Sequence, residues 1–205
     1  MQEIKPISTY KQGLKELILN AAMAAFTEKG IRAVKMDDVA ASLSISKRTL
    51  YEIYANKEDL LFEVVRHLRA KKKAEMLEIR SSGSDVMEMI LWSYKTKVDE
   101  FRLTSPAFYS DLSKYPRVLQ YLERENQGTR GDFLKFLNRG VEEGYFRNDV
   151  NFDLASRMFE ALGRYIMSEE LYKRYSIEDI FKDIVFVSLR GLCTLKGVQA
   201  LEKFY

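Results

Sequence analysis

The sequence predicts an all-α protein, with a three-helix helix-turn-helix domain over residues 1–55 and a larger helical domain over residues 56–205. Two observations support this fold class. Apolar residues recur three and four positions apart through most of the chain, which is the period of an amphipathic helix. No stretch alternates as a strand does, and only three prolines and ten glycines interrupt 205 residues. Helices can therefore account for most of the chain.

The first two predicted helices are separated by a glycine. The apolar face of the first consists of Leu14, Leu17, Ile18, Ala21, Ala22, Ala25 and Phe26. Gly30 then acts as a C-terminal stop. The second helix is short and carries Met36, Val39, Ala40 and Leu43. Residues 44–46 form a turn, after which Ser46 can cap a third helix from Lys47 to about Tyr54.

The third helix divides into an apolar side and a polar side at about 100° per residue. The side that can pack inward holds Leu50, Ile53 and Tyr54. The opposite side holds Lys47, Arg48, Tyr51 and Glu52. This division is typical of a recognition helix, whose first residues enter the major groove. Lys or Arg donates to guanine, and Thr or Tyr contacts phosphate or a thymine methyl. The alternative is a helical hairpin with a solvated charged face, and the length of the whole pattern argues against it.

A long fourth helix is expected from Asn56 to about Arg80. Asn56 and Asp59 resemble a capping box with Asp in place of Glu or Gln. Lys57 lies in the first turn, where its backbone N–H and its ammonium can hold a phosphate. Residues 81–84, Ser-Ser-Gly-Ser, end the helix. They are too few for a flexible linker, so the fourth helix is expected to join the two domains rigidly.

Helices and turns alternate through the rest of the chain. The sequence predicts helices over residues 85–102, between Pro106 and Pro116, over 116–143, over 152–168 and over 177–201, with a turn at 144–149. Proline at the first turn suits the helix that begins at Pro116.

The segment from Ile18 to Leu60 resembles the N-terminal domain of the TetR family of transcriptional regulators. The residues that carry the resemblance are Ile18, Ala21, Ala22, Phe26, Gly30, Val39, Ala40, Ser46, Thr49, Leu50, Tyr51, Lys57, Glu58 and Leu60. The resemblance covers about the first third of the chain. Beyond it, the helical order and the stretch EEGYFRNDVNFDLASRMFEAL are similar to the family's turn before its penultimate helix.

Five residues depart from the family pattern. Val34-Lys35 stands where the family usually has a Thr/Ser pair, and Lys35 can replace the hydroxyl's phosphate contact with a charge. Ser44 replaces a frequent glycine and would cost about 1 kcal/mol in a left-handed conformation. Ile53 replaces a residue that is often aromatic or His, and Tyr54 replaces a frequent core Phe. The expected DNA contacts are Lys35, Ser46, Lys47, Arg48, Thr49, Tyr51 and Lys57, with Lys5 and Lys11 as further cations.

The resemblance implies that the C-terminal domain binds a small molecule and dimerises. One apolar stripe is formed by Leu154, Met158, Phe159, Leu162 and Ile166, and another by Ile180, Ile184, Val187, Leu192 and Leu195. The last helix is apolar over a wide arc, which indicates burial on more than one side. A symmetric four-helix contact between two copies would cover both stripes. The alternative is that both simply pack within one protomer.

A ligand site is expected among aromatic residues of the C-terminal domain. Its candidates are Trp92, Tyr109, Phe133 and Phe159. An aromatic-lined pocket between helices can hold an apolar ligand. Aromatic residues at helical spacing are also ordinary core residues, so each candidate has that second interpretation.

Composition excludes several other classes of protein. The net charge of +3 is small, so a nucleic-acid footprint must be a local basic patch. Cys193, expected inside a helix, and His67 are the single Cys and His, which argues against a metal site, a disulfide, a cofactor and an enzyme. The first residues lack the apolar core of a signal peptide, and no apolar run reaches about 18 residues. We therefore expect a cytoplasmic protein without a membrane partner.

These observations together predict a homodimeric transcriptional repressor that binds a pseudo-palindromic double-stranded operator and is released by a small-molecule effector. The alternative is a DNA-binding protein that is controlled by a protein partner or has no small-molecule effector.

Overall fold

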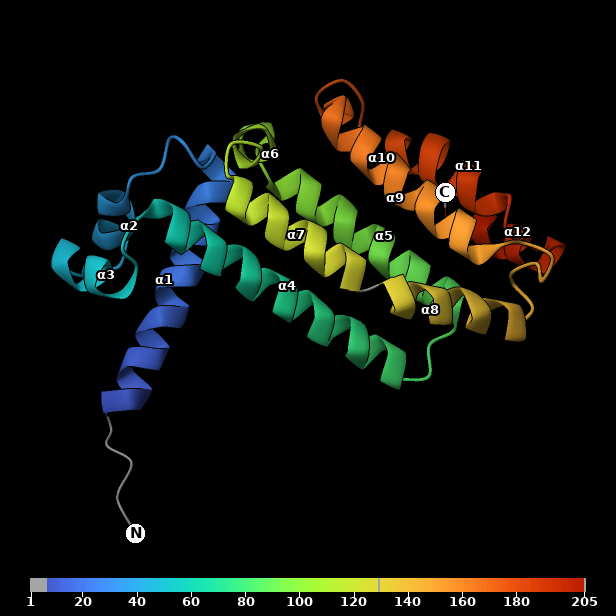
Figure 1. Ribbon diagram of the computed structural model, residues 1–205, viewed down its shortest axis with the longest axis horizontal. Helices are drawn as coiled ribbons and strands as arrows, with labels where there is room; N and C mark the ends of the chain where they lie inside the picture. The colour runs from blue at the N-terminus through green and yellow to red at the C-terminus, as the bar shows by residue number, and fades with distance from the viewer. Residues whose placement is uncertain (1–6, 129, 205) are drawn as a thin grey trace, which may run out of the picture. The chain divides into compact units, whose positions relative to one another are not determined.

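The computed structural model describes residues 7–128 and 130–204, and the regular elements within these residues are all helices (Figure 1). None of the helices in this part of the chain is long and apolar enough to span a bilayer. The all-α fold class predicted from the sequence is confirmed.

The helices form two compact units. The first comprises Met1–Lys73 and Leu103–Tyr121, and the second comprises Ala74–Arg102 and Leu122–Tyr205. The compact units thus follow a different division from the expected domain boundary at residue 55, because residues 103–121 belong to the unit that contains the N-terminal helices. The boundary at residue 55 as a division of function stays a prediction.

The first unit is built on α1 (Ile7–Lys29), α2 (Met36–Ser42), α3 (Lys47–Ile53), the first part of α4 (Lys57–Ser81) and α6 (Pro106–Leu112). Figure 1 shows α2 and α3 beside α1 and the start of α4. The buried apolar side chains of these helices include Ile18, Ala22, Phe26, Val39, Ala40, Leu50, Leu60, Leu61, Val64 and Phe108. Most of them are the apolar positions that the sequence periodicity predicts.

The turns of this unit follow the expected signals. Gly30 ends α1 with a φ of +84°, a conformation that glycine adopts without strain. Ser44 has a φ of +53°, so the left-handed turn conformation is present and carries the expected cost of about 1 kcal/mol. The Ser46 hydroxyl caps α3 by accepting from the Thr49 N–H at 3.0 Å. Asn56 caps α4 as predicted by accepting from the Asp59 N–H at 2.9 Å. The return bond of the predicted capping box differs, because the Asp59 carboxylate accepts from the Asn56 side-chain amide at 2.9 Å and not from its backbone N–H.

The second unit contains most of α5 (Val86–Leu103), the end of α7 (Pro116–Gly128), and the helices α8 (Arg130–Glu142) and α9 (Phe152–Ser168). The short elements that follow α9 are Leu171–Lys173, α10 (Ile177–Ile180), a π-helix over Phe181–Phe186, α11 (Val187–Arg190), α12 (Leu195–Leu201) and Glu202–Phe204. Its buried core is formed by Val86, Met87, Leu137, Phe146, Ala155, Phe186, Leu189, Leu192, Cys193 and Leu201. The predicted single helix over 116–143 corresponds to α7 and α8, and their junction at residue 129 lies outside the described residues.

The prediction of one continuous helix over residues 177–201 is wrong. A turn at residues 191–194 separates α11 from α12, and Thr194 caps α12 by accepting from the Gly197 N–H. The turn pairs with the preceding loop, since the Arg147 N–H donates to the Leu192 carbonyl at 2.9 Å. Cys193 is therefore buried in this turn and not in a helix. Leu192 and Cys193 of this turn are buried, as apolar residues of a continuous helix would also be, so hydrophobic periodicity could not reveal the interruption.

Candidate nucleic-acid interface

Helix α3 exposes its charged face to solvent and buries its apolar face. Leu50 is fully buried and Tyr54 is nearly so, whereas Tyr51, on the opposite side of the helix, is 48% exposed. The side chains of Lys47 and Arg48 are exposed. This arrangement matches the division expected from the helical wheel. It leaves the first turn of α3 open to a partner.

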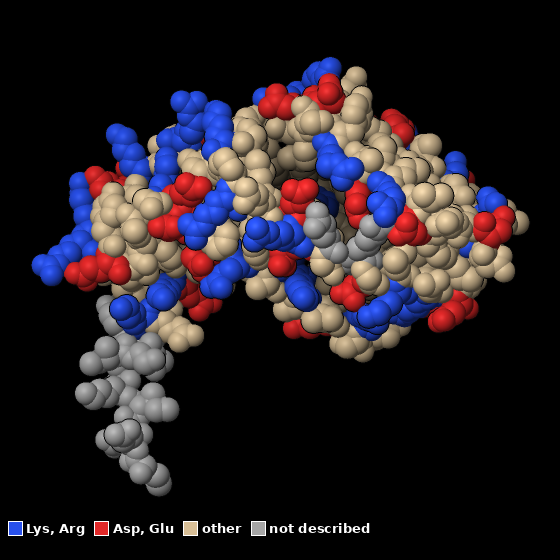
Figure 2. All heavy atoms as spheres, viewed as in Figure 1, with Lys and Arg blue, Asp and Glu red and all other residues tan. Residues whose placement is uncertain are grey.

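Each exposed cation of α3 is paired with a carboxylate. The Lys47 ammonium donates to Asp37 at the start of α2, and the Arg48 Nε donates to Glu52 at 2.8 Å, one turn further along α3. The hydrogen bond to Asp37 raises the pKa of Lys47 above its ordinary value. Figure 2 shows the same mixture of Lys or Arg and Asp or Glu side chains over α2 and α3. A phosphate or a base would therefore compete with these carboxylates for Lys47 and Arg48, whose side chains keep further N–H donors.

Three of the predicted contacts also take part in helix caps. The Ser46 hydroxyl lies 2.8 Å from the Thr49 hydroxyl, and both residues are used at the start of α3. Lys35 occupies the N-cap of α2, where its backbone N–H donates to the Asp38 carboxylate at 2.8 Å. A lysine side chain has no acceptor, so Lys35 supplies half of a capping box and its exposed ammonium takes no part in the cap. Lys5 lies outside the described residues.

Lys57 is placed differently from the expectation. Its ammonium donates to the carbonyls of Ile31 at 2.9 Å, Val34 at 3.0 Å and Arg32 at 3.3 Å. An ammonium has three N–H donors, and all three are used. Burial lowers the pKa of Lys57, and the neighbouring Asp111 carboxylate opposes that shift. This geometry speaks against a phosphate contact through the ammonium, although the Lys57 backbone N–H remains at the start of α4.

Helix α6, which the sequence did not place near the DNA-reading helices, packs against the end of α1 in the same unit. The Ser105 N–H donates to the Thr27 carbonyl at 2.7 Å. The Asp111 carboxylate accepts from the Arg32 N–H at 2.8 Å. A lone Asp in a short helix carries no sequence signal for this contact, because its partner is a backbone group 79 residues away.

The comparisons with known proteins agree with this geometry. Residues 18–64 match the family described as "Bacterial regulatory proteins, tetR family". The HTH-type transcriptional repressor KstR2 of Mycobacterium tuberculosis is 32% identical over 146 residues, which cover 68% of this chain and 72% of the relative. The chain belongs to the TetR family. KstR2 of Rhodococcus jostii is 28% identical, over 72% of this chain and 74% of the relative.

The similarity extends to solved structures of the TetR family. The structure of the ketosteroid transcriptional regulator KstR2 of Mycobacterium tuberculosis superposes with a TM-score of 0.55 and 25% identity. The alignment covers 88% of this chain and 95% of that protein. The helix-turn-helix prediction and the family assignment are thus confirmed, and the chain is a DNA-binding transcriptional regulator rather than an enzyme.

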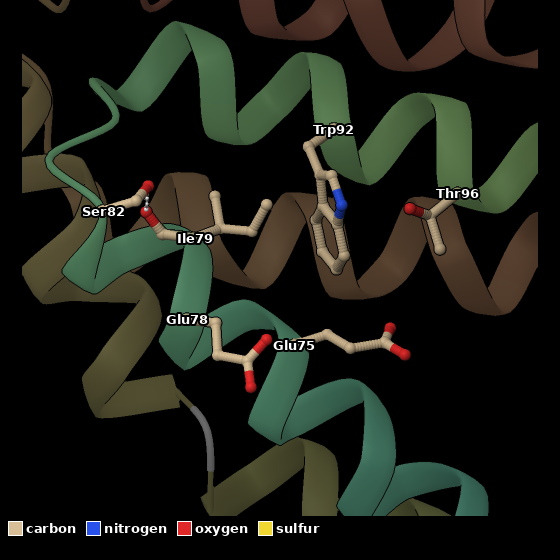
Figure 3. A pocket seen from close by; sticks show the side chains of 6 residues that line it. All are labelled: Glu75, Glu78, Ile79, Ser82, Trp92 and Thr96. Atoms are coloured by element: carbon tan, nitrogen blue, oxygen red, sulfur yellow. Dashed lines mark hydrogen bonds between the residues drawn. The ribbon is translucent and has the colours of Figure 1, made fainter.

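The four predicted ligand residues occupy three settings. Phe133 and Phe159 contact each other edge-to-face, with ring centroids 6.2 Å apart. Tyr109 belongs to the first compact unit, where it packs against Phe108. Trp92 lines a cavity of about 390 Å³ between α5 and the end of α4. Figure 3 shows the indole extending from α5 toward Ile79 of α4.

The cavity beside Trp92 has an acidic character that the sequence analysis did not anticipate. Its other lining residues are Glu75, Glu78, Ile79, Ser82 and Thr96. The Ser82 hydroxyl is directed to the Ile79 carbonyl at 2.8 Å. Apart from Ser82, which directly follows α4, these residues lie on consecutive turns of α4 and on α5, so helical spacing could have suggested them once the two helices were known to be adjacent.

The second unit leaves an apolar face uncovered on α9. Leu154 is 63% exposed, and Met158 and Tyr165 follow it on the same side of the helix. Val187 of α11 is 62% exposed. By contrast, Leu189 and Leu192 are buried in the protomer core. The two predicted stripes are therefore divided between the protomer core and an exposed surface.

Proposed function

We infer that this TetR-family protein is a homodimeric repressor that reads a pseudo-palindromic operator with α3. The observation that carries this proposal is the exposed first turn of α3, with Lys47, Arg48 and Tyr51 outward and Leu50 buried. Arg and Lys at the start of a recognition helix are suited to guanine, and Tyr51 is suited to a phosphate or a thymine methyl. Ser46, Thr49, Lys35 and the Lys57 backbone N–H would contact the sugar-phosphate backbone.

The exposed apolar residues of α9 and of α11 support dimerisation. Large apolar side chains gathered on one face usually mark an interaction site. A second copy of the same chain would cover Leu154, Met158 and Val187 with their own counterparts around a twofold axis. Two α3 helices related by that axis match an operator with inverted symmetry, because the half-sites then repeat with the protein's symmetry.

A small-molecule effector would act through its different affinities for the DNA-binding and released states. Trp92 and its cavity support a site in the second unit, with Phe133 and Phe159 as further candidates. The relative KstR2 is described as a ketosteroid transcriptional regulator, so steroids form one arm of an effector screen. Cationic aromatics form a second arm, because Glu75 and Glu78 line the cavity beside the indole.

The test is a selection of the full-length protein against random double-stranded DNA. We expect an enriched sequence with inverted symmetry. Binding to it should fall with salt at a log–log slope of roughly −4 or steeper, as several phosphate contacts per protomer require. A selection that enriches no symmetric sequence would refute the operator proposal. A screen for thermal stabilisation by small molecules, followed by operator binding with and without each hit, tests the effector; a tight ligand without effect on operator affinity would favour control by a protein partner.

A further inference from the structure

The short segment between α1 and α2, residues 31–34, is held from two different helices. Lys57 at the start of α4 donates to three of its carbonyls, at 2.9–3.3 Å. Asp111 at the end of α6 accepts the Arg32 N–H at 2.8 Å. The Ile31 and Val34 side chains of the segment are buried. Four backbone groups of a loop are thus bound by two oppositely charged side chains.

The contact between α6 and Gly30, the residue just before this segment, is close. A Cβ on Gly30 would lie 2.9 Å from the Ala107 Cβ and 3.2 Å from the Asp111 Oδ2. Together with its positive φ, this proximity leaves room for glycine alone. Asp111 is only 8% exposed, and its other oxygen lies 3.4 Å from the Lys114 ammonium. Its carboxylate is therefore committed to this place in the fold.

Residues 31–34 determine where α2 begins. Lys35 caps α2, and α2 packs against α3 and pairs Asp37 with Lys47 of α3. A change in residues 31–34 would therefore shift α2, and α3 with it. Hydrogen bonds to base edges need exact distances and angles, whereas phosphate contacts are largely independent of sequence.

We propose that Lys57 and Asp111 are positioning residues for DNA reading, which clamp residues 31–34 and so set the orientation of α2 and α3. This role rests on the proposed function of α3. It assigns Lys57 to the protein backbone instead of to a DNA phosphate, and it makes Asp111 of α6 part of the DNA-reading apparatus.

The two roles of Lys57 predict different binding data. We would compare the selected operator with a shuffled duplex of equal length, at several salt concentrations, for wild type and Lys57→Met. A clamp predicts that operator affinity falls about tenfold or more, the size of a lost charged hydrogen-bond partner. It also predicts that binding to the shuffled duplex and the salt slope stay nearly unchanged. A phosphate contact predicts equal weakening on both duplexes and a slope smaller by about 1, and that result would overturn the proposal.

Asp111 offers a rescue test. Asp111→Ala removes the acceptor for the Arg32 N–H, so we expect the same selective loss of operator affinity. Asp111→Asn keeps an amide oxygen that can accept this hydrogen bond. It should therefore retain most of the wild-type ratio of operator affinity to shuffled-duplex affinity. Val98→Ala, a core change in the second unit, is the matched control for loss of stability. The clamp would be contradicted if Val98→Ala lowered the ratio of operator affinity to shuffled-duplex affinity equally. It would also be contradicted if Asp111→Ala left that ratio unchanged.

The clamp can also be measured without DNA. Hydrogen exchange of the Arg32 amide should be slow in the wild type and in Asp111→Asn, and at least about tenfold faster in Asp111→Ala. This measurement tests the clamp even if the Lys57→Met variant fails to fold. An Arg32 amide that exchanges equally fast in all three proteins would overturn the proposal. Failure of wild type to select any operator would instead count against the proposed function, so the two failures are distinguishable.

Discussion

The helices α3 and α9 each bury one face and expose the other, but the exposed faces differ in chemistry. That of α3 carries Lys47, Arg48 and Glu52, and that of α9 carries Leu154, Met158 and Tyr165. Charged groups are well solvated, so the α3 face is stable in water and can exchange its partners for phosphates or bases. Apolar groups gain free energy when they leave water. The α9 face is therefore suited to the apolar contact of the proposed dimer, and the α3 face to a transient charged partner.

The largest effect is expected on the apolar face. Leu154→Glu should give a folded monomer, because the side chain is 63% exposed in the protomer but would be buried in the dimer. Operator affinity should fall by about 10²-fold or more, since each half-site is then bound separately. Sedimentation and operator titration measure both effects.

Two companion variants sharpen this prediction. Leu103→Glu changes an even more exposed leucine outside the α9 face, and it should leave the dimer intact. Leu189→Glu places a charge in the protomer core and should unfold the chain rather than dissociate it. A wild-type monomer at micromolar concentration would contradict the dimer itself.

The next effect concerns base reading by the charged face. Arg48→Ala should cost about 1–3 kcal/mol at the operator and relax preference at particular base pairs. The loss should be smaller on shuffled DNA. Repeating the DNA selection with the variant measures which positions lose preference. Uniform weakening of all sequences would show that Arg48 contacts phosphate and not a base edge.

A smaller effect of opposite sign is expected from the carboxylate beside Lys47. Asp37→Asn replaces the charged acceptor that competes with phosphate for Lys47 by a neutral amide, and it removes a negative charge that repels DNA. Binding to shuffled DNA should tighten roughly two- to fivefold, the scale of an exposed ion pair. Asp38→Asn on the same helix is the matched control. Equal tightening by both variants would indicate a general charge effect instead of competition for Lys47.

A loss of comparable size is expected from Tyr51→Phe. The Tyr51 side chain is about half exposed, and loss of one hydroxyl contact to phosphate should cost about 0.5–1.5 kcal/mol on all sequences alike. Titration of the operator and the shuffled duplex measures this. Unchanged affinity would mean that the ring alone contributes.

The N-terminal helices were predictable because their signals are local. Ser46, Asn56 and Gly30 act on neighbouring backbone groups, and each is found in the expected role. The C-terminal helices were less predictable. The turn at residues 191–194 depends on pairing with residues 145 and 147, which are distant in sequence.

The candidate site shows the same limit. The outward face of α3 follows from helical period alone, so Lys47, Arg48 and Tyr51 could be named from the sequence. The partners of those residues could not, because Asp37 reaches Lys47 only once α2 packs against α3. Lys57 was expected to contact a phosphate, because nothing in the sequence indicates that its ammonium donates to three backbone carbonyls.

The sequence by itself determined the all-α fold class and the charged face of α3, since periodicity, caps and turn residues act over a few positions. The family followed from the resemblance of residues 18–60. Only the tertiary structure decided which apolar residues of α9–α12 are core and which are exposed. It alone placed α6 against residues 27–32 and joined Asp111 to the Arg32 N–H. Contacts of that kind depend on backbone groups, which every residue carries, and so they leave no trace in residue identity until the helices are packed.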